Sequence, residues 1–183
     1  MRIYLVTDEM LLFGKDLYRT VEAAVKGGVG MVQLREKESS TRECVERAIR
    51  LKEVLAPYGV PLIINDRVDV ALASDADGVH VGQSDMPYEM VKRLLPEGKM
   101  IGLSVESPEQ VLEANDYDLD YVAASPVFSI QKGFKATGAL HPTEGFYREV
   151  KLIGVNAGHF WGKNGHSGIS YMYKSSVILD IIG

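Results

Sequence analysis

Short apolar runs alternate with longer amphipathic segments along the first two thirds of the chain. The apolar runs are rich in β-branched residues and have the length of strands, and they cover residues 3–6, 31–34, 62–64, 79–81, 100–103 and 121–124. The intervening segments space their apolar residues as one face of a helix does, at residues 17–28, 40–59, 86–98 and 107–118. Strands that alternate with helices predict βαβ units and a parallel sheet.

Two arrangements of such units fit this alternation, an open doubly wound sheet and a closed (β/α) barrel. The glycine-rich dinucleotide fingerprint is missing after the first predicted strand, which removes the strongest argument for the open sheet. Polar residues come after several successive strands, whereas an open sheet would gather them at one topological switch point. In a barrel the carboxyl ends of all strands face one mouth, so this distribution favours an α/β protein of the (β/α)8 TIM-barrel type.

The pattern changes after about residue 126. Residues 125–142 have the character of a loop, residues 143–154 of one more helix, and in the glycine-rich remainder only residues 177–182 resemble a strand. An eight-stranded barrel takes about 200 residues or more. We therefore expect a single domain over residues 1–183 whose last two βα units are degenerate or truncated, with an atypical tail at 152–183. Missing strands expose sheet edges, so we also expect low stability or self-association into a homo-oligomer.

Composition and charge narrow the classes of function. The 183 residues carry a formal net charge of -5 at pH 7, so the chain has no basic footprint for nucleic acid, and an anionic ligand needs a locally basic pocket. The single cysteine, Cys44, allows no internal disulfide and fits a reducing compartment. No apolar run reaches membrane-spanning length, and the N-terminal run has no cleavage site. We expect a cytoplasmic protein with neither nucleic acid nor membrane as a partner.

The end of the second predicted strand, "VQLREK", carries two cations. Alternation along a strand places Gln33, Arg35 and Lys37 on one side. Arginine offers a planar fork of donors and lysine a point charge, so the trio suits an anion. A solvated strand end is the simpler interpretation of any one of these residues. The three together, on one side, favour an anion site.

Carboxylates follow the next two strands. Asn65-Asp66 ends one, and Gly82-Gln83-Ser84-Asp85 follows the other, so both acids are expected at the mouth. Two close carboxylates raise each other's pKa unless a cation lies between them, and oxygen ligands with room for phosphates suit Mg²⁺. Each aspartate taken alone could be a turn or helix-capping residue. Beside the cationic trio, the pair predicts a metal–diphosphate site.

Isolated polar residues give weaker signals. Gln83 and Ser104 end strands and could hydrogen-bond a polar ring or simply complete a turn. His80, within "VHV", is interpreted as a packed strand histidine rather than a ligand.

Five strings in order, "YLVTD", "GGVGMVQLREK", "LIINDRVDVALASDADGVHVGQSDMP", "IGLSVES" and "DYVAASPVF", resemble the thiamine-phosphate synthases and the thiazole tautomerases of the same superfamily. The resemblance covers about residues 1–128. It implies a (β/α)8 barrel and a Mg²⁺-dependent transferase acting on small-molecule substrates. The reaction joins 4-amino-2-methyl-5-hydroxymethylpyrimidine diphosphate to thiazole phosphate, giving thiamine phosphate and diphosphate.

The resemblance also implies roles for individual residues. The pyrimidine diphosphate would be held by Gln33, Arg35, Lys37 and Asn65, with Ser104 on the pyrimidine. Asp66 and Asp85 would bind Mg²⁺. The candidate catalytic residues are Arg35 and Lys37, which would stabilise charge on the departing diphosphate, together with Ser104.

The chain departs from the family pattern after "SPVF". The synthases usually have a Thr-x-Thr-Lys stretch there, which contacts the thiazole phosphate and the diphosphate. This chain has "SIQKGF", in which Ser129 and Lys132 are the nearest chemical substitutes. The family's Gly-Gly and Val-Ser turns, which form the phosphate cup after the seventh and eighth strands, are not found in residues 152–183, as in a truncated or frame-shifted barrel end.

Two alternatives stay open. A thiazole tautomerase would carry a histidine just before "VF", where this chain has Ser125-Pro126. The lost phosphate cup instead suggests a catalytically impaired barrel that only binds pyrimidine diphosphate.

Overall fold

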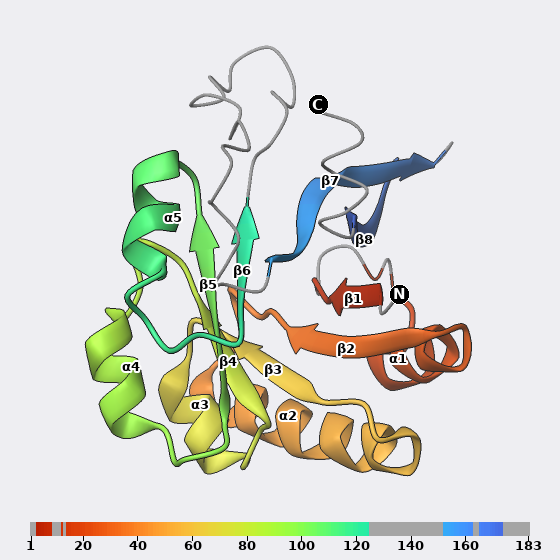
Figure 1. Ribbon diagram of the computed structural model, residues 1–183. Helices are drawn as coiled ribbons and strands as arrows, with labels where there is room; N and C mark the ends of the chain where they lie inside the picture. The colour runs from red at the N-terminus through yellow and green to blue at the C-terminus, as the bar shows by residue number, and fades with distance from the viewer. Residues whose placement is uncertain (1–2, 9–11, 13, 125–151, 163–164, 174–183) are drawn as a thin grey trace.

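The computed structural model describes residues 3–8, 12, 14–124, 152–162 and 165–173 (Figure 1). Within these ranges, the six predicted strands form neighbouring parallel strands of one sheet, each paired with the next along the chain. They are β1 (Ile3–Val6), β2 (Val29–Leu34), β3 (Leu62–Asn65), β4 (Gly78–Val81), β5 (Met100–Val105) and β6 (Tyr121–Ala124). The α/β class is confirmed, and the six strands curve into a half-barrel.

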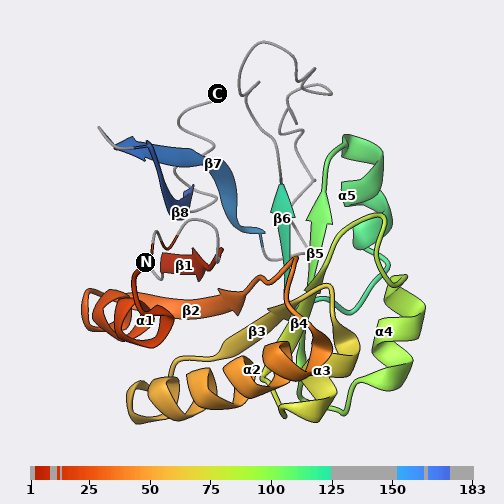
Figure 2. The same cartoon turned by 180° about the vertical axis from the view of Figure 1, so that it is seen from behind.

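The helices connect these strands and cover one side of the sheet (Figure 2). They are α1 (Leu17–Lys26), α2 (Thr41–Leu55), α3 (Val68–Ala73), α4 (Tyr88–Leu94) and α5 (Pro108–Ala114), with a short 3₁₀ turn η2 (Ala56–Tyr58). Helix α1 begins where the Asp16 side chain accepts from the Arg19 N–H, and α2 begins with a capping box between Ser40 and Glu43. No helix in the described ranges is both long and apolar enough to cross a bilayer.

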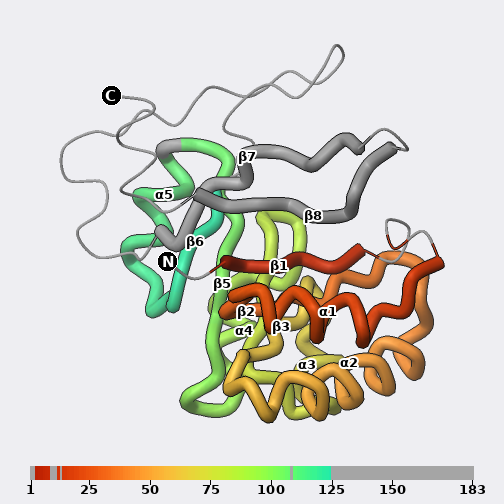
Figure 3. The backbone as a smooth tube through the Cα atoms, turned by 90° about the vertical axis from the view of Figure 1, so that its right-hand side faces the viewer, coloured from red at the N-terminus to blue at the C-terminus, as the bar shows by residue number. Residues whose placement is uncertain are grey.

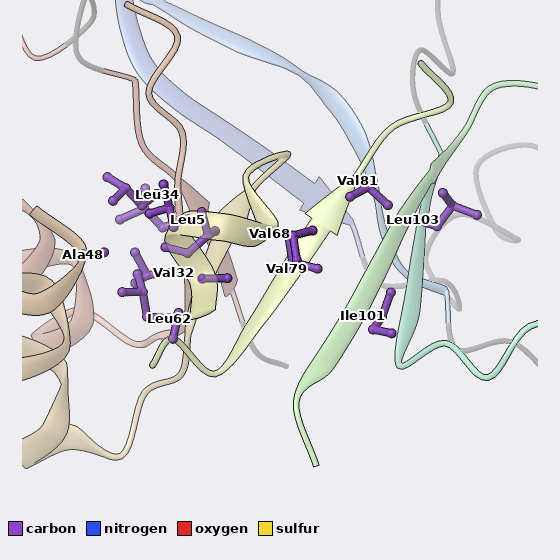
Figure 4. Close-up of a cluster of buried hydrophobic side chains, with 14 of the residues drawn as sticks. Leu5, Val32, Leu34, Ala48, Leu62, Val68, Val79, Val81, Ile101 and Leu103 are labelled. Atoms are coloured by element: carbon purple, nitrogen blue, oxygen red, sulfur yellow. The ribbon is translucent and has the colours of Figure 1, made fainter. Parts of the chain in front are cut away.

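The main core lies between the sheet and its helices (Figure 4). Strand residues such as Val32, Leu62 and Val79 are fully buried there, and Ala48 and Leu51 of α2 pack into the same cluster. Because successive strand residues point to opposite faces, the intervening positions of each strand lie on the inner face of the half-barrel. Several of these inner positions are polar, which matters for the site below.

The C-terminal part differs from the prediction. Strand β7 (Leu152–Gly162) pairs in parallel with β6, but β8 (Gly165–Tyr173) is antiparallel to β7. The expectation that residues 152–173 hold no strand is therefore wrong. An antiparallel pair needs no crossover helix, and the dipeptide Asn164-Gly165 in the sequence is a hairpin signal. The predicted strand at 177–182, and the part of the predicted helix at 143–151, lie outside the described residues.

The hairpin of β7 and β8 continues the sheet beyond β6. Strand β8 contacts β1. Figure 3 shows β1 beside β2, with which it pairs in parallel. The described sheet thus runs from β1 through β6 in parallel and continues as an antiparallel hairpin.

Candidate active site

Three predicted site residues meet at the carboxyl ends of β2, β3 and β4. Lys37 Nζ lies 2.6 Å from Asp66 Oδ2, in a pair whose lysine is half exposed. Asp66 has a positive φ of 61°, which is uncommon for a residue other than glycine but tolerated by aspartate. Its backbone N–H donates to the carbonyl oxygen of His80 at 2.8 Å. This bond fixes the turn that follows β3 against β4, and so places the Asp66 carboxylate beside the next loop.

Asp85 completes this acidic pair from the loop after β4. Its Oδ2 accepts from the Gly82 N–H at 2.7 Å. Burial raises the pKa of the Asp85 carboxyl above its ordinary value, and so does the Asp66 carboxyl, with which it shares a hydrogen bond. The Gly82 N–H and the Lys37 charge act in the opposite direction. The two acids therefore face each other closely enough to disfavour double ionisation, a condition that a bound cation relieves.

The acidic pair fits Mg²⁺ as a ligand set. This ion commonly takes one or two protein carboxylates and completes its shell with waters and substrate phosphates. In the part of the chain that the structure describes, no group of three or more histidine, cysteine or acidic side chains is arranged to hold a metal. Asp66 and Asp85 supply two carboxylate donors here.

Arg35 lies at the neighbouring strand ends, between β1 and β2. Its guanidinium is 2.7 Å from Asp8 Oδ2, and its backbone N–H donates to Thr7 Oγ1. Both cations of "VQLREK" are therefore paired with carboxylates. A phosphate group entering this edge would compete for each of them.

The residue between these cations is buried. The Glu36 side chain is only 3% exposed, and its Oε2 lies 2.5 Å from an Arg47 nitrogen of α2 and 3.1 Å from Ser39 Oγ. This ion pair attaches the end of β2 to α2. It holds the backbone from which Arg35 and Lys37 project.

Gln33, the third member of the predicted anion clamp, is not at the exposed edge. It is buried on the inner face, and its Nε2 donates to Tyr4 Oη at 2.7 Å. Tyr4 Oη lies 2.7 Å from Tyr121 Oη, which lies 3.1 Å from His80 Nδ1. His80 Nε2 in turn lies 2.9 Å from Ser104 Oγ.

Sequence reasoning missed this hydrogen-bonded chain. The interpretation of His80 as a packed residue is confirmed, since it is buried and burial lowers its pKa to about 4. Tyr4 and Tyr121 drew no attention because tyrosine is common in strands. The usable signal was polar atoms at inner-face positions of five apolar strands, where each buried polar atom needs a partner.

The other predicted residues are placed as follows. Asn65 is half-buried at the last position of β3, and Gln83 Nε2 donates to the Ser104 carbonyl oxygen at 2.6 Å. Ser129 and Lys132 lie outside the described residues.

Comparison with known proteins gives consistent matches. The family model described as thiamine monophosphate synthase matches residues 3–139. The thiamine-phosphate synthase of Albidiferax ferrireducens is 52% identical over 129 residues, which are 70% of this chain and 59% of the relative. That of Clostridium acetobutylicum is 44% identical over 158 residues, which are 86% of this chain and 75% of the relative.

A solved structure matches as well. The thiamine phosphate pyrophosphorylase from Pyrococcus furiosus is 41% identical, with a TM-score of 0.64, over 69% of this chain and 61% of that chain. The matched region of this chain thus spans about three fifths of the length of the Pyrococcus protein and of the Albidiferax relative.

Proposed function

The chain belongs to the thiamine monophosphate synthase family, and on that premise we propose that it is a Mg²⁺-dependent transferase making thiamine phosphate. Its substrates would be 4-amino-2-methyl-5-hydroxymethylpyrimidine diphosphate and thiazole phosphate, and diphosphate would leave. The observation that carries the proposal is the meeting of Lys37, Asp66 and Asp85 at three neighbouring strand ends.

We assign the residues of this edge to the diphosphate. Asp66 and Asp85 would hold Mg²⁺, which when bound neutralises charge on the departing diphosphate. Arg35 and Lys37 would exchange their present carboxylate partners, Asp8 and Asp66, for phosphate oxygens. Charge that grows on the leaving group is then met by fixed cations rather than by water that must reorganise.

The rest of the substrate lies toward the inner face in this proposal. Gln33, Asn65 and Ser104 would bind the pyrimidine side. Departure of diphosphate breaks the C–O bond and leaves a pyrimidinylmethyl cation, which the thiazole nitrogen captures when both rings are held in contact. Ser129 and Lys132 stay candidates for the phosphate contacts beyond β6.

For the fold, we propose a single domain over residues 1–183 of the (β/α)8 type. Residues 1–128 would be the family-like part, and the last two βα units would be degenerate. The described hairpin of β7 and β8, in place of a seventh and eighth unit, supports this proposal. A cytoplasmic location and self-association stay predictions.

The same hairpin favours a second candidate function, a barrel that binds pyrimidine diphosphate without turning it over. The family's phosphate cup belongs to the two units that the hairpin replaces. An assay of thiamine phosphate with both substrates and Mg²⁺ separates the two candidates. Turnover eliminates the binder, whereas stabilisation by pyrimidine diphosphate without product eliminates the enzyme.

Calorimetric titration with inorganic diphosphate, with and without Mg²⁺, tests the assigned edge. Asp66→Asn keeps a side chain that tolerates the left-handed backbone, so it removes charge without strain. We expect this variant and Asp85→Asn each to weaken Mg²⁺-dependent binding by at least about tenfold, as loss of a charged ligand predicts.

Lys92→Met is the matched control, because Lys92 pairs with Asp118 on the exposed outer surface. We expect it to bind as the wild type does. Unchanged binding by both aspartate variants would refute the assignment.

A further inference from the structure

The hydrogen-bonded chain on the inner face links five strands and ends at the mouth. Its members are buried except for the last, and in order they are Gln33, Tyr4, Tyr121, His80 and Ser104. Ser104 is half-buried near the carboxyl end of β5. The described contacts therefore connect a buried amide to a hydroxyl that reaches the proposed binding edge.

The Gln33 amide, whose nitrogen faces Tyr4 Oη, sets a direction for this chain, whereas the hydroxyl and imidazole contacts by themselves fit either direction. Gln33 Nε2 can only donate, so Tyr4 Oη accepts from it. Among the described residues, the acceptor that the structure offers the Tyr4 hydrogen is Tyr121 Oη. The Tyr121 hydroxyl then has its own hydrogen for His80 Nδ1. This order uses the hydroxyl hydrogens of both buried tyrosines, which matters because an unused buried donor costs about 1–3 kcal/mol.

The direction decides the form of His80 and the role of Ser104. If Nδ1 accepts, the neutral ring carries its proton on Nε2 and donates it to Ser104 Oγ. Ser104 Oγ is thus already an acceptor within the chain. Its own hydrogen is left to point toward the mouth.

The fold makes room for this arrangement at one glycine. Gly102 on β5 is in register with His80 on one side and Tyr121 on the other. A Cβ atom at Gly102 would collide with the Tyr121 ring. The absence of a side chain there lets the Tyr121 ring lie beside the His80 ring, at a centroid separation of 5.4 Å and an interplanar angle of 19°.

We propose that the chain from Gln33 fixes Ser104 as a hydrogen-bond donor, which recognises an acceptor nitrogen of the pyrimidine ring. Tyr4, Tyr121 and His80 are then positioning residues that act through Ser104. The inference rests on the proposed function for the identity of the ligand, whereas the direction of the chain is a property of the protein alone. A ring with C–H in place of that nitrogen would leave the Ser104 donor unpaired and bind less well.

The first experiment reads the direction without any ligand. Nitrogen-15 spectra of the full chain, with the His80 signals assigned by their loss in His80→Asn, report which ring nitrogen carries the proton. We expect the Nε2–H form. In Gln33→Glu, whose carboxylate can only accept, we expect the proton to move to Nδ1. An Nδ1–H form in the wild type would overturn the proposal.

The second experiment reads recognition. Binding is measured for the aminopyrimidine diphosphate and for its two analogues in which one ring nitrogen is replaced by C–H. We expect the wild type to bind one analogue about tenfold more weakly, which is the loss of one hydrogen bond. In Tyr121→Phe this difference should fall to about twofold or less, while Mg²⁺-dependent binding of inorganic diphosphate is retained.

Two further variants keep the test decisive. Tyr4→Phe breaks the same chain if Tyr121→Phe does not fold, and Ser104→Thr, which keeps the hydroxyl, should preserve the discrimination that Ser104→Ala loses. Equal binding of all three rings by the wild type would refute recognition by Ser104. If the wild type does not bind inorganic diphosphate with Mg²⁺, the proposed function is refuted. The spectroscopic result on the His80 proton would not be affected.

Discussion

Acidification should destabilise the fold through one buried group, His80. Burial lowers the pKa of this imidazole from 6.5 to about 4. Well above pH 6.5 the ring is neutral in both the folded and the unfolded chain, so it does not favour either state. As the pH falls below 6.5, the unfolded chain binds a proton that the folded chain refuses, and stability is lost until the folded pKa is passed. The shift corresponds to about 3 kcal/mol in full and to about 2 kcal/mol at pH 5.

The assay is urea unfolding of the wild type and of His80→Asn between about pH 7.5 and about pH 4.5. This range covers the pH values over which the protonation of His80 should change the stability. Carboxylates titrate in both proteins, so the difference between their free energies of unfolding isolates the histidine. We expect that difference to shrink by about 2 kcal/mol between pH 7 and pH 5. A difference that stays constant over this range would mean that the pKa of His80 is the same in the folded and the unfolded state. It would refute the burial of His80 as a neutral ring.

Two further substitutions test the packing around the site by the same unfolding measurement, and a third is a surface control. Arg47→Leu removes a cation that faces the buried Glu36 carboxylate, and we expect it to destabilise the fold by about 3 kcal/mol. The double variant Arg47→Leu with Glu36→Gln should lose less stability, because it leaves no buried charge without this partner. An equal loss in the two variants would contradict this. Gly102→Ala should cost about 1–3 kcal/mol or more, since its methyl group meets the Tyr121 ring, and an unchanged midpoint would show that the ring can move. Lys92→Met removes an exposed ion pair and should change stability by less than about 0.5 kcal/mol.

The strand–helix alternation made the first two thirds of the fold predictable. Parallel strands buried on both faces appear as continuous apolar runs, and every such run up to Ala124 is a strand in the structure. The tail was not predictable in the same way. Strand β7 contains Gly154, Gly158 and Gly162, and glycine weakens the apolar periodicity on which the prediction depends. The apolar pattern within one strand does not show which residues of another strand it pairs with, so the pairing of β7 with β8 could not be predicted from it.

The site was predictable where it depends on strand ends. Lys37, Asp66 and Asp85 are far from one another in the sequence. They lie at one edge because each follows the carboxyl end of a neighbouring parallel strand. Gln33 shows where the reasoning stopped. Alternation predicted that it lies on the side of Arg35 and Lys37. Gln33 is within β2 and is buried against Tyr4, whereas the two cations follow the end of the strand.

The central claim is that these strand ends surround one metal-bound diphosphate, and a crystal structure of the chain with Mg²⁺ and inorganic diphosphate tests it most directly. We predict one magnesium ion with oxygens of both Asp66 and Asp85 at about 2.0–2.1 Å, and Lys37 moved from Asp66 to a phosphate oxygen. A diphosphate bound elsewhere, or a metal that neither aspartate touches, would contradict the account.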